Sequence, residues 1–286
     1  MTEPTNQLAL TVLPPGLDHP EGVAWGPDGK VYAGGEAGQI YRLDLAGNTC
    51  ETIANTGGFV LGLAHDAAGN IYACDQARKE VVKVTPSGEV SSYCAGNSAQ
   101  ALRMRVPNYP VFDADGNLYV SDSGEWGARN GFIWRIRPGG EADIWDRQAS
   151  GFTNGMCLGA DGRSLYVVES TPPLISHIPF NADGSAGARS VVVELPRTVP
   201  DGVALDVAGN LTISCYNPNI IFRYGTDGKL VTLYDDWEQL ILVAPTNIAF
   251  GGAGLRTLII ASLCGWNLTT APVEIAGLPV KYPHVG

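Results

Sequence analysis

The chain has little positive charge. It carries 18 lysines and arginines against 29 aspartates and glutamates, which gives a formal net charge of −11. Nucleic-acid binding relies on clustered basic side chains, so this balance argues against nucleic acid, and against anionic membrane surfaces, as partners. No apolar run is long enough to span a bilayer, and the first residues lack the basic and apolar regions of a signal peptide. We therefore expect a cytoplasmic protein that acts on a small molecule.

Paired cysteines and a serine-nucleophile motif are also missing. The six cysteines occur singly, with no Cys-x-x-Cys pair. We expect them to be reduced, buried packing residues and not to form a zinc site. The chain contains no Gly-x-Ser-x-Gly sequence, which argues against a serine hydrolase triad.

Glycine, by contrast, is abundant at 36 residues, and much of it belongs to a sequence pattern that recurs six times. Each copy has a short apolar run, a turn and a second apolar run, as in 200–215. The turn glycines are spaced by 40, 47, 46, 47 and 45 residues, at Gly29, Gly69, Gly116, Gly162, Gly209 and Gly254. This period is typical of propeller blades, and Asp-Gly and Gly-Asn turns favour hairpins over a solenoid.

We predict an all-β fold, a six-bladed β-propeller with four-stranded antiparallel blades that occupies residues 1–286 as a single domain. The N-terminal segment 7–13 alternates weakly in hydropathy. We expect it to add a strand to the last blade beside 269–280 and so close the ring. The two longest irregular segments, 95–107 and 123–130, are expected to shape the mouth of a pocket.

One column of the repeat carries most of the chemistry. Just before the first strand of each copy stand Glu21, Leu61, Asn108, Asn154, Asp201 and Thr246. Equivalent positions of propeller blades surround one axis, so these residues form a ring in which every side chain except that of Leu61 offers an oxygen donor. Such donors suit one divalent ion, with Ca²⁺ expected and Zn²⁺, Mn²⁺ or Fe²⁺ as alternatives. The competing interpretation is that Asn and Asp only stabilise turns before the strands.

The copies, together with Pro20-Glu21-Gly22, Asn154-Gly155 and Pro200-Asp201-Gly202, resemble the regucalcin–gluconolactonase family from about residue 19 to 261. The resemblance implies a six-bladed propeller that holds a divalent metal and hydrolyses lactones. By resemblance, Glu21, Asn154 and Asp201 would be metal ligands, and Asn108 a fourth ligand or a substrate contact. Asp201 would also be the catalytic base or nucleophile. Where many relatives have a substrate-facing aspartate after the Asn108 equivalent, this chain has Tyr109, and Val106 replaces an arginine.

We therefore expect a lactonase with a flat or apolar substrate, bound by Asn108, Tyr109, Asp122 and Trp126. Asp122 belongs to a second column, at the end of each second strand, that also contains Asp75 and Glu169. These carboxylates could instead accept backbone hydrogen bonds. His65 falls in an apolar column and is expected in the core, whereas His19 could lie near the mouth. Two alternatives stay open: another metal-dependent reaction, such as phosphotriester hydrolysis or condensation or isomerisation at a carbonyl, and a non-enzymatic Ca²⁺-binding propeller. The sequence does not indicate the oligomeric state.

Overall fold

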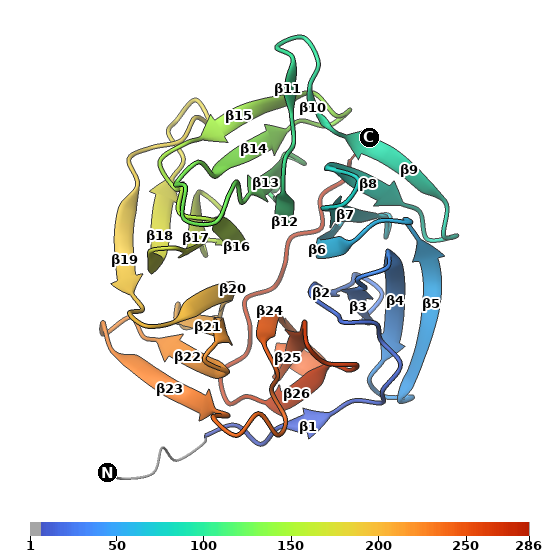
Figure 1. Cartoon of the computed structure of the whole chain (residues 1–286), viewed down its shortest axis with the longest axis vertical. Coiled ribbons are helices and arrows are strands. Elements are labelled where there is room, and N and C mark those ends of the chain that lie inside the picture. The colour runs from blue at the N-terminus through green and yellow to red at the C-terminus, as the bar shows by residue number, and fades with distance from the viewer. Residues whose placement is uncertain (1–6, 286) are drawn as a thin grey trace.

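A computed structural model describes residues 7–285 as six four-stranded antiparallel sheets arranged around a central axis (Figure 1). Five blades follow the order of the chain, and the strands of each are given from the axis outward. The first blade contains β2 (Val23–Trp25), β3 (Val31–Gly34), β4 (Gln39–Asp44) and β5 (Thr49–Asn55), the second contains β6 (Val60–His65), β7 (Ile71–Asp75), β8 (Glu80–Val84) and β9 (Val90–Cys94), and the third contains β12 (Pro107–Phe112), β13 (Leu118–Asp122), β14 (Phe132–Ile136) and β15 (Ala142–Asp146). The fourth blade contains β16 (Thr153–Leu158), β17 (Ser164–Ser170), β18 (Pro173–Pro179) and β19 (Ser190–Glu194), and the fifth contains β20 (Val199–Leu205), β21 (Leu211–Asn217), β22 (Ile220–Tyr224) and β23 (Leu230–Asp235). The predicted six-bladed propeller is thus confirmed.

The sixth blade joins the two ends of the chain. It contains β24 (Pro245–Gly251), β25 (Thr257–Ser262), β26 (Thr269–Pro272) and, on its outer edge, β1 (Thr11–Val12). Strand β1 pairs antiparallel with β26 through Thr11 and Val12, as predicted for the N-terminal segment. A short 3₁₀ helix, η1 (Ala253–Leu255), lies between β24 and β25. Within the described part of the chain, no helix is long and apolar enough to cross a membrane.

The segment after β26 departs from the strand predicted for residues 269–280. It leaves the blade after Pro272 and crosses the far end of the central channel (Figure 1). There Leu278 N–H donates to Leu205 O, the Tyr282 hydroxyl donates to Trp25 O, and Ala67 N–H donates to Pro283 O. The C-terminal segment therefore braces several blades instead of lengthening one sheet.

The hairpin turns follow from local chemistry. All six turn glycines have positive φ, between 63° and 84°, which glycine adopts without a Cβ clash. In three of the turns, Asp66, Asp113 and Asp206 each accept hydrogen bonds from backbone N–H groups two and four residues later. These carboxylates fix the turn, so the apolar runs on either side pair in register.

Aliphatic and aromatic side chains from facing sheets fill the space between blades in six separate clusters. The irregular segment 95–107 contains an additional hairpin, β10 (Gly96–Asn97) with β11 (Leu102–Arg103), that projects from the ring (Figure 1). All six cysteines are free. Cys74, Cys94 and Cys215 are buried as expected, whereas Cys50 and Cys264 are exposed and Cys157 is half-buried.

Candidate functional site

Five of the six predicted ring positions lie on β-bulges, where the innermost strands begin, and Glu21 lies just before β2. Pro200 of β20 pairs with Cys215 of β21, and Val203 pairs with Ile213. Between these two pairs β20 therefore has one more residue than β21. The same irregularity occurs at the equivalent place on β6, β12, β16 and β24. A bulge inserts one unpaired residue and turns its side chain away from the sheet. The repeated bulge therefore presents one or two side chains per blade to the axis.

Glycines let neighbouring bulges approach closely. A Cβ on Gly155 would lie 2.5 Å from the backbone oxygen of Asp201, and one on Gly202 would lie 2.7 Å from that of Thr246. Gly22 and Gly62 approach the backbone carbonyls of Leu61 and Asn108 in the same way. In four blades, then, the residue after the ring position must be glycine because the next blade's carbonyl occupies the place of its side chain.

The four polar residues predicted for the site are all buried, with at most 7% of their surface exposed: Glu21, Asn108, Asn154 and Asp201. Leu61, also buried, contributes no donor atom, and Thr246 donates its hydroxyl to Glu21 O. Burial and then the charge of Asp201 raise the pKa of Glu21, and burial, opposed by the Asn154 side chain, raises that of Asp201, as expected for groups that lie close together.

Asn247 belongs to the same site, although it was missed in the sequence. It follows Thr246 on the bulge of β24, where four other blades have glycine, and it is fully buried. Its Nδ2 donates to the Glu21 side chain at 3.0 Å and to Glu21 O at 3.2 Å. A polar residue within a column of glycines was the signal that could have identified it.

Several oxygen atoms at the ring lack a partner. The side-chain oxygens Oδ1 of Asn108, Asn154, Asp201 and Asn247 are buried and accept no hydrogen bond from the protein. The amide nitrogens of Asn154 and Asn247 are used, by Ser170 Oγ and by Glu21, which leaves their oxygens free. Buried polar atoms are normally paired, and unpaired ones cost free energy. Carboxylate and amide oxygens in this arrangement fit a hard divalent cation.

The electrostatics of the two carboxylates point the same way. Burial raises the pKa of Asp201 to about 7, against a partial offset from Asn154. Burial, and then the negative charge of Asp201, raise the pKa of Glu21 well above its usual range, although the hydrogen bond from Asn247 opposes this. Two repelling, desolvated carboxylates favour a shared proton or a bound cation.

The second column serves the fold. Asp122 accepts hydrogen bonds from Arg105 N, Val106 N and Trp134 Nε1, and Glu169 accepts from Ser150 N and Gly151 N. These carboxylates thus anchor the loops that lead to the ring, which is the alternative anticipated above. The substrate contact predicted for Asp122 stays a prediction without support from these hydrogen bonds.

The two aromatic residues predicted to contact substrate lie in different places. Trp126 is exposed on the β13–β14 loop, on the ring face, and packs edge-on against Phe152 with 5.0 Å between ring centroids. Tyr109 lines a cavity of about 230 Å³ in the central channel, together with apolar residues such as Met156 and Val203. Burial raises the pKa of the Tyr109 hydroxyl, so it is neutral. The C-terminal segment 278–282 also lines this cavity.

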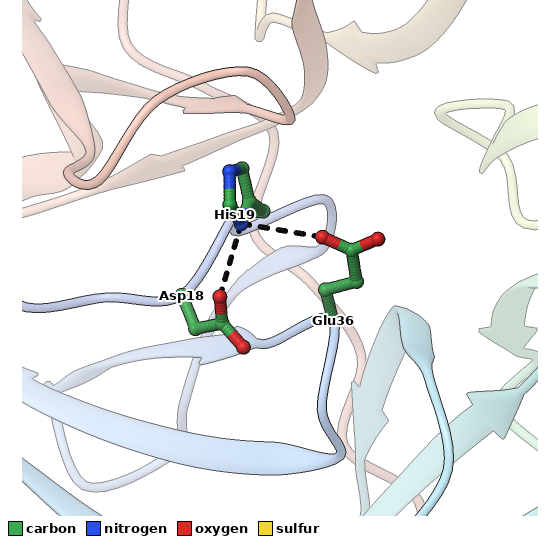
Figure 2. A group of neighbouring side chains, drawn as sticks. All are labelled: Asp18, His19 and Glu36. Atoms are coloured by element: carbon green, nitrogen blue, oxygen red, sulfur yellow. Dashed lines mark hydrogen bonds and ion pairs between the residues drawn. The ribbon is translucent and has the colours of Figure 1, made fainter.

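His65 lies in the core as expected, whereas a position of His19 near the mouth stays a prediction. His65 is buried, its ring lies 4.5 Å from that of Tyr32, and neither ring nitrogen has a partner. His19 lies between two carboxylates, with Nδ1 3.0 Å from Asp18 Oδ1 and 3.2 Å from Glu36 Oε2 (Figure 2). The Asp18–His19–Glu36 cluster is partly exposed, and its second Asp18 oxygen accepts from Ala37 N and Gln39 Nε2. It therefore pins the loop that leads to Glu21.

Comparison with known proteins agrees with the propeller fold. The profile of the SMP-30/Gluconolactonase/LRE-like region matches residues 19–263. The chain belongs to this family. One family relative, a 6-deoxy-6-sulfogluconolactonase of Pseudomonas putida, is 32% identical over 241 residues, which span 79% of this chain and 76% of the relative. An uncharacterized protein of Sulfolobus acidocaldarius is 30% identical over 139 residues, 46% of this chain and about half (49%) of the relative.

Solved structures show the same fold at lower identity. A gluconolactonase from Xanthomonas campestris superposes with a TM-score of 0.79 at 19% identity, over 93% of this chain and 90% of the other. Regucalcin from Agrobacterium tumefaciens, described as a calcium-binding protein, gives a TM-score of 0.77 at 18% identity over 98% of both chains. The family resemblance predicted from the motifs is confirmed.

Proposed function

We propose that this protein is a metal-dependent lactonase that opens the ring of a small-molecule lactone. The observation that carries the proposal is the group of buried, unpaired oxygen atoms beside two repelling carboxylates. Membership of the family and similarity to a sulfogluconolactonase support lactone hydrolysis. Glu21, Asn154 and Asp201 would hold the ion, with Asn108 as a further ligand or substrate contact. We expect Ca²⁺, and Zn²⁺, Mn²⁺ or Fe²⁺ are the alternatives.

Each residue has a defined task in this proposal. A divalent cation at this place would polarise the lactone carbonyl and stabilise negative charge on its oxygen. The Asp201 carboxylate accepts a proton from the water that adds to the carbonyl carbon. The ring C–O bond then breaks, and the proton passes to the leaving alkoxide, which gives a hydroxy acid. Asn247 positions Glu21 through its amide nitrogen.

The first experiment is elemental analysis of the purified protein, combined with a pH-indicator assay on a lactone panel before and after chelation. We expect stoichiometric metal and hydrolysis that is lost on chelation and restored by the metal. Asp201→Ala should abolish turnover and Asn154→Ala should weaken metal binding, whereas Asp183→Ala, in an exposed turn beyond β18, should change neither. Full activity of Asp201→Ala with normal metal content would contradict the assignment.

A non-enzymatic calcium-binding role is the second candidate. Structural similarity to the calcium-binding regucalcin of Agrobacterium tumefaciens favours it. In that case the protein would bind Ca²⁺ with a large rise in melting temperature, and no lactone or other ester of the panel would be hydrolysed. Metal binding without hydrolysis would thus keep the site and discard the lactonase.

A further inference from the structure

Hydroxyl groups beside the ring join four of the six blades to the next one. Each donates to the backbone carbonyl of a ring position or of the residue directly before it: Ser123 Oγ to Thr153 O, Ser170 Oγ to Pro200 O, Ser214 Oγ to Thr246 O, and Thr246 Oγ1 to Glu21 O. All four donors are buried, with at most 2% of their surface exposed. Within residues 7–285, no hydroxyl makes such a bond at Leu61 or Asn108. The bridged segments thus include those of the three proposed metal ligands.

Of these four hydroxyls, that of Ser170 also bonds the side chain of a proposed ligand. Ser170 is the last residue of β17, and its Oγ lies 2.7 Å from Pro200 O and 3.3 Å from Asn154 Nδ2. Its backbone N–H donates to Phe152 O, two residues before Asn154, at 3.2 Å. Ser170 therefore holds the Asn154 side chain, the segment that leads to it, and the segment that leads to Asp201 on the next blade.

The direction of these hydrogen bonds determines how the Asn154 side chain is turned. A carbonyl oxygen can only accept, so the single hydroxyl proton of Ser170 is used by Pro200 O. Toward Asn154 the Ser170 Oγ then offers only lone pairs, and the carboxamide must present its nitrogen, which donates. The opposite orientation would place two oxygen acceptors against each other in a buried site, which costs free energy.

The same constraint leaves the Asn154 oxygen free. With Nδ2 bonded to Ser170, Oδ1 is buried and accepts no hydrogen bond from the protein. Hard cations bind amide oxygens, whereas the amide nitrogen has no lone pair to offer. A carboxamide turned the other way would therefore remove one ligand from the ring without changing its amino-acid sequence.

We propose that Ser170 is a positioning residue that holds the Asn154 carboxamide with Oδ1 available to the metal. The proposal rests on the metal site described above and adds how one of its ligands is oriented. The hydroxyl acts through Asn154 and has no direct contact with the ion. Partners that orient metal ligands in this way typically change metal affinity about 10- to 100-fold when they are removed.

Calcium titration of the chelator-treated protein by calorimetry tests this role. In Ser170→Ala the carboxamide is free to rotate, so Ca²⁺ affinity should fall about tenfold. Ser164→Ala is the matched control, because Ser164 is a buried serine at the opposite end of the same strand. It should leave the affinity unchanged. Wild-type Ca²⁺ affinity in Ser170→Ala would overturn the proposal.

A second background separates orientation of the amide from general support of the fold. A carboxylate presents an oxygen in either orientation, so Asn154→Asp no longer needs a partner that sets its direction. In this background Ser170→Ala should change Ca²⁺ affinity less than about twofold, whereas it costs about tenfold beside Asn154. An equal loss in both backgrounds would show that Ser170 only supports the fold, and would refute the positioning role.

The orientation can also be measured without metal or substrate. In the metal-free wild type, NMR should show nuclear Overhauser contacts between the side-chain amide protons of Asn154 and the β protons of Ser170, and their absence would refute the proposal. If no lactone is hydrolysed but these contacts and the tenfold loss are present, the lactonase fails and the role of Ser170 stands. Lactone hydrolysis by a Ser170→Ala protein with wild-type Ca²⁺ affinity would keep the lactonase and refute the role of Ser170.

Discussion

Gly155 offers a direct way to disturb the geometry of the ring without removing any of its oxygen donors. It follows Asn154 on the bulge of β16, and its hydrogen occupies the place where a side chain would begin. In Gly155→Ala, the new Cβ would lie 2.5 Å from Asp201 O and 2.9 Å from the Gly202 Cα. Both atoms belong to the backbone of the next blade, so no side chain can rotate to make room.

The size of the effect follows from these contacts. Ordinary van der Waals contact of a Cβ begins at 3.4 Å. Strands β16 and β20 must therefore separate by about 0.9 Å at the point where each presents a site residue. Catalytic constellations tolerate displacements of about 0.5 Å, and a shift of about 1 Å can cost a hundredfold in rate. We expect a similar loss in kcat/KM, a roughly tenfold or greater loss of Ca²⁺ affinity, and about 1–3 kcal/mol less stability.

A second glycine in the same blade provides the control. Gly162 lies in the turn between β16 and β17 with a φ of +68°, and a Cβ there would meet no atom within 4 Å. Gly162→Ala should cost about 1–2 kcal/mol through backbone strain alone and leave the ring spacing unchanged. Calcium titration of the chelator-treated proteins, thermal unfolding and the lactone assay, each well below the melting temperature, should separate the two variants.

Gly155→Ala protein that binds Ca²⁺ and turns over lactones like the wild type, while its melting temperature falls, would contradict this expectation. A loss of activity in parallel with stability in both variants would also contradict it, because the loss would then not be specific to the ring.

Two further predictions concern buried polar groups. Burial lowers the pKa of His65 from 6.5 to about 4, so the unfolded chain binds its proton first and stability is lost as pH falls from about 6.5 toward 4. His65→Leu introduces the residue found at the equivalent positions Leu158 and Leu205 and should raise the free energy of unfolding. The gain over wild type should be about 2 kcal/mol larger at pH 5 than at pH 8. Urea unfolding that shows an equal gain at both pH values would contradict this. Asn247→Ala removes the hydrogen bond to Glu21 and should weaken Ca²⁺ binding about tenfold, as calorimetry would measure; unchanged affinity would show that the amide does not position the carboxylate.

The fold could be predicted from the sequence because its determinants are local and recur. The six turn glycines all have positive φ, and in three of the turns a carboxylate before the glycine closes the turn by short-range hydrogen bonds. The C-terminal segment has no such pattern. Its course is fixed by contacts with distant residues such as Trp25 and Leu205, so a strand extending to residue 280 was the wrong expectation.

The site could be predicted only in part, for a geometric reason. Alignment on the turns finds the bulge of each inner strand but does not show which of its two residues faces the axis. On β24 both Thr246 and Asn247 contact Glu21, and only Thr246 was in the predicted column. The second column shows another limit, because Asp122 has the same residue type whether it binds substrate or the backbone. Only its hydrogen-bond partners distinguish the two.

Those partners also explain why the ring is distinct from the rest of the fold. Elsewhere the chain buries carboxylates by bonding them, as Asp206 does in its turn and Glu169 does with Arg189 and two backbone N–H groups. At the ring, Asp201 Oδ1 is buried with no hydrogen bond, and its charge opposes that of Glu21. This buried repulsion between two carboxylates costs free energy, and a chain tolerates such a cost where function requires it. A divalent cation is the partner that would balance both carboxylates and occupy the free amide oxygens around them.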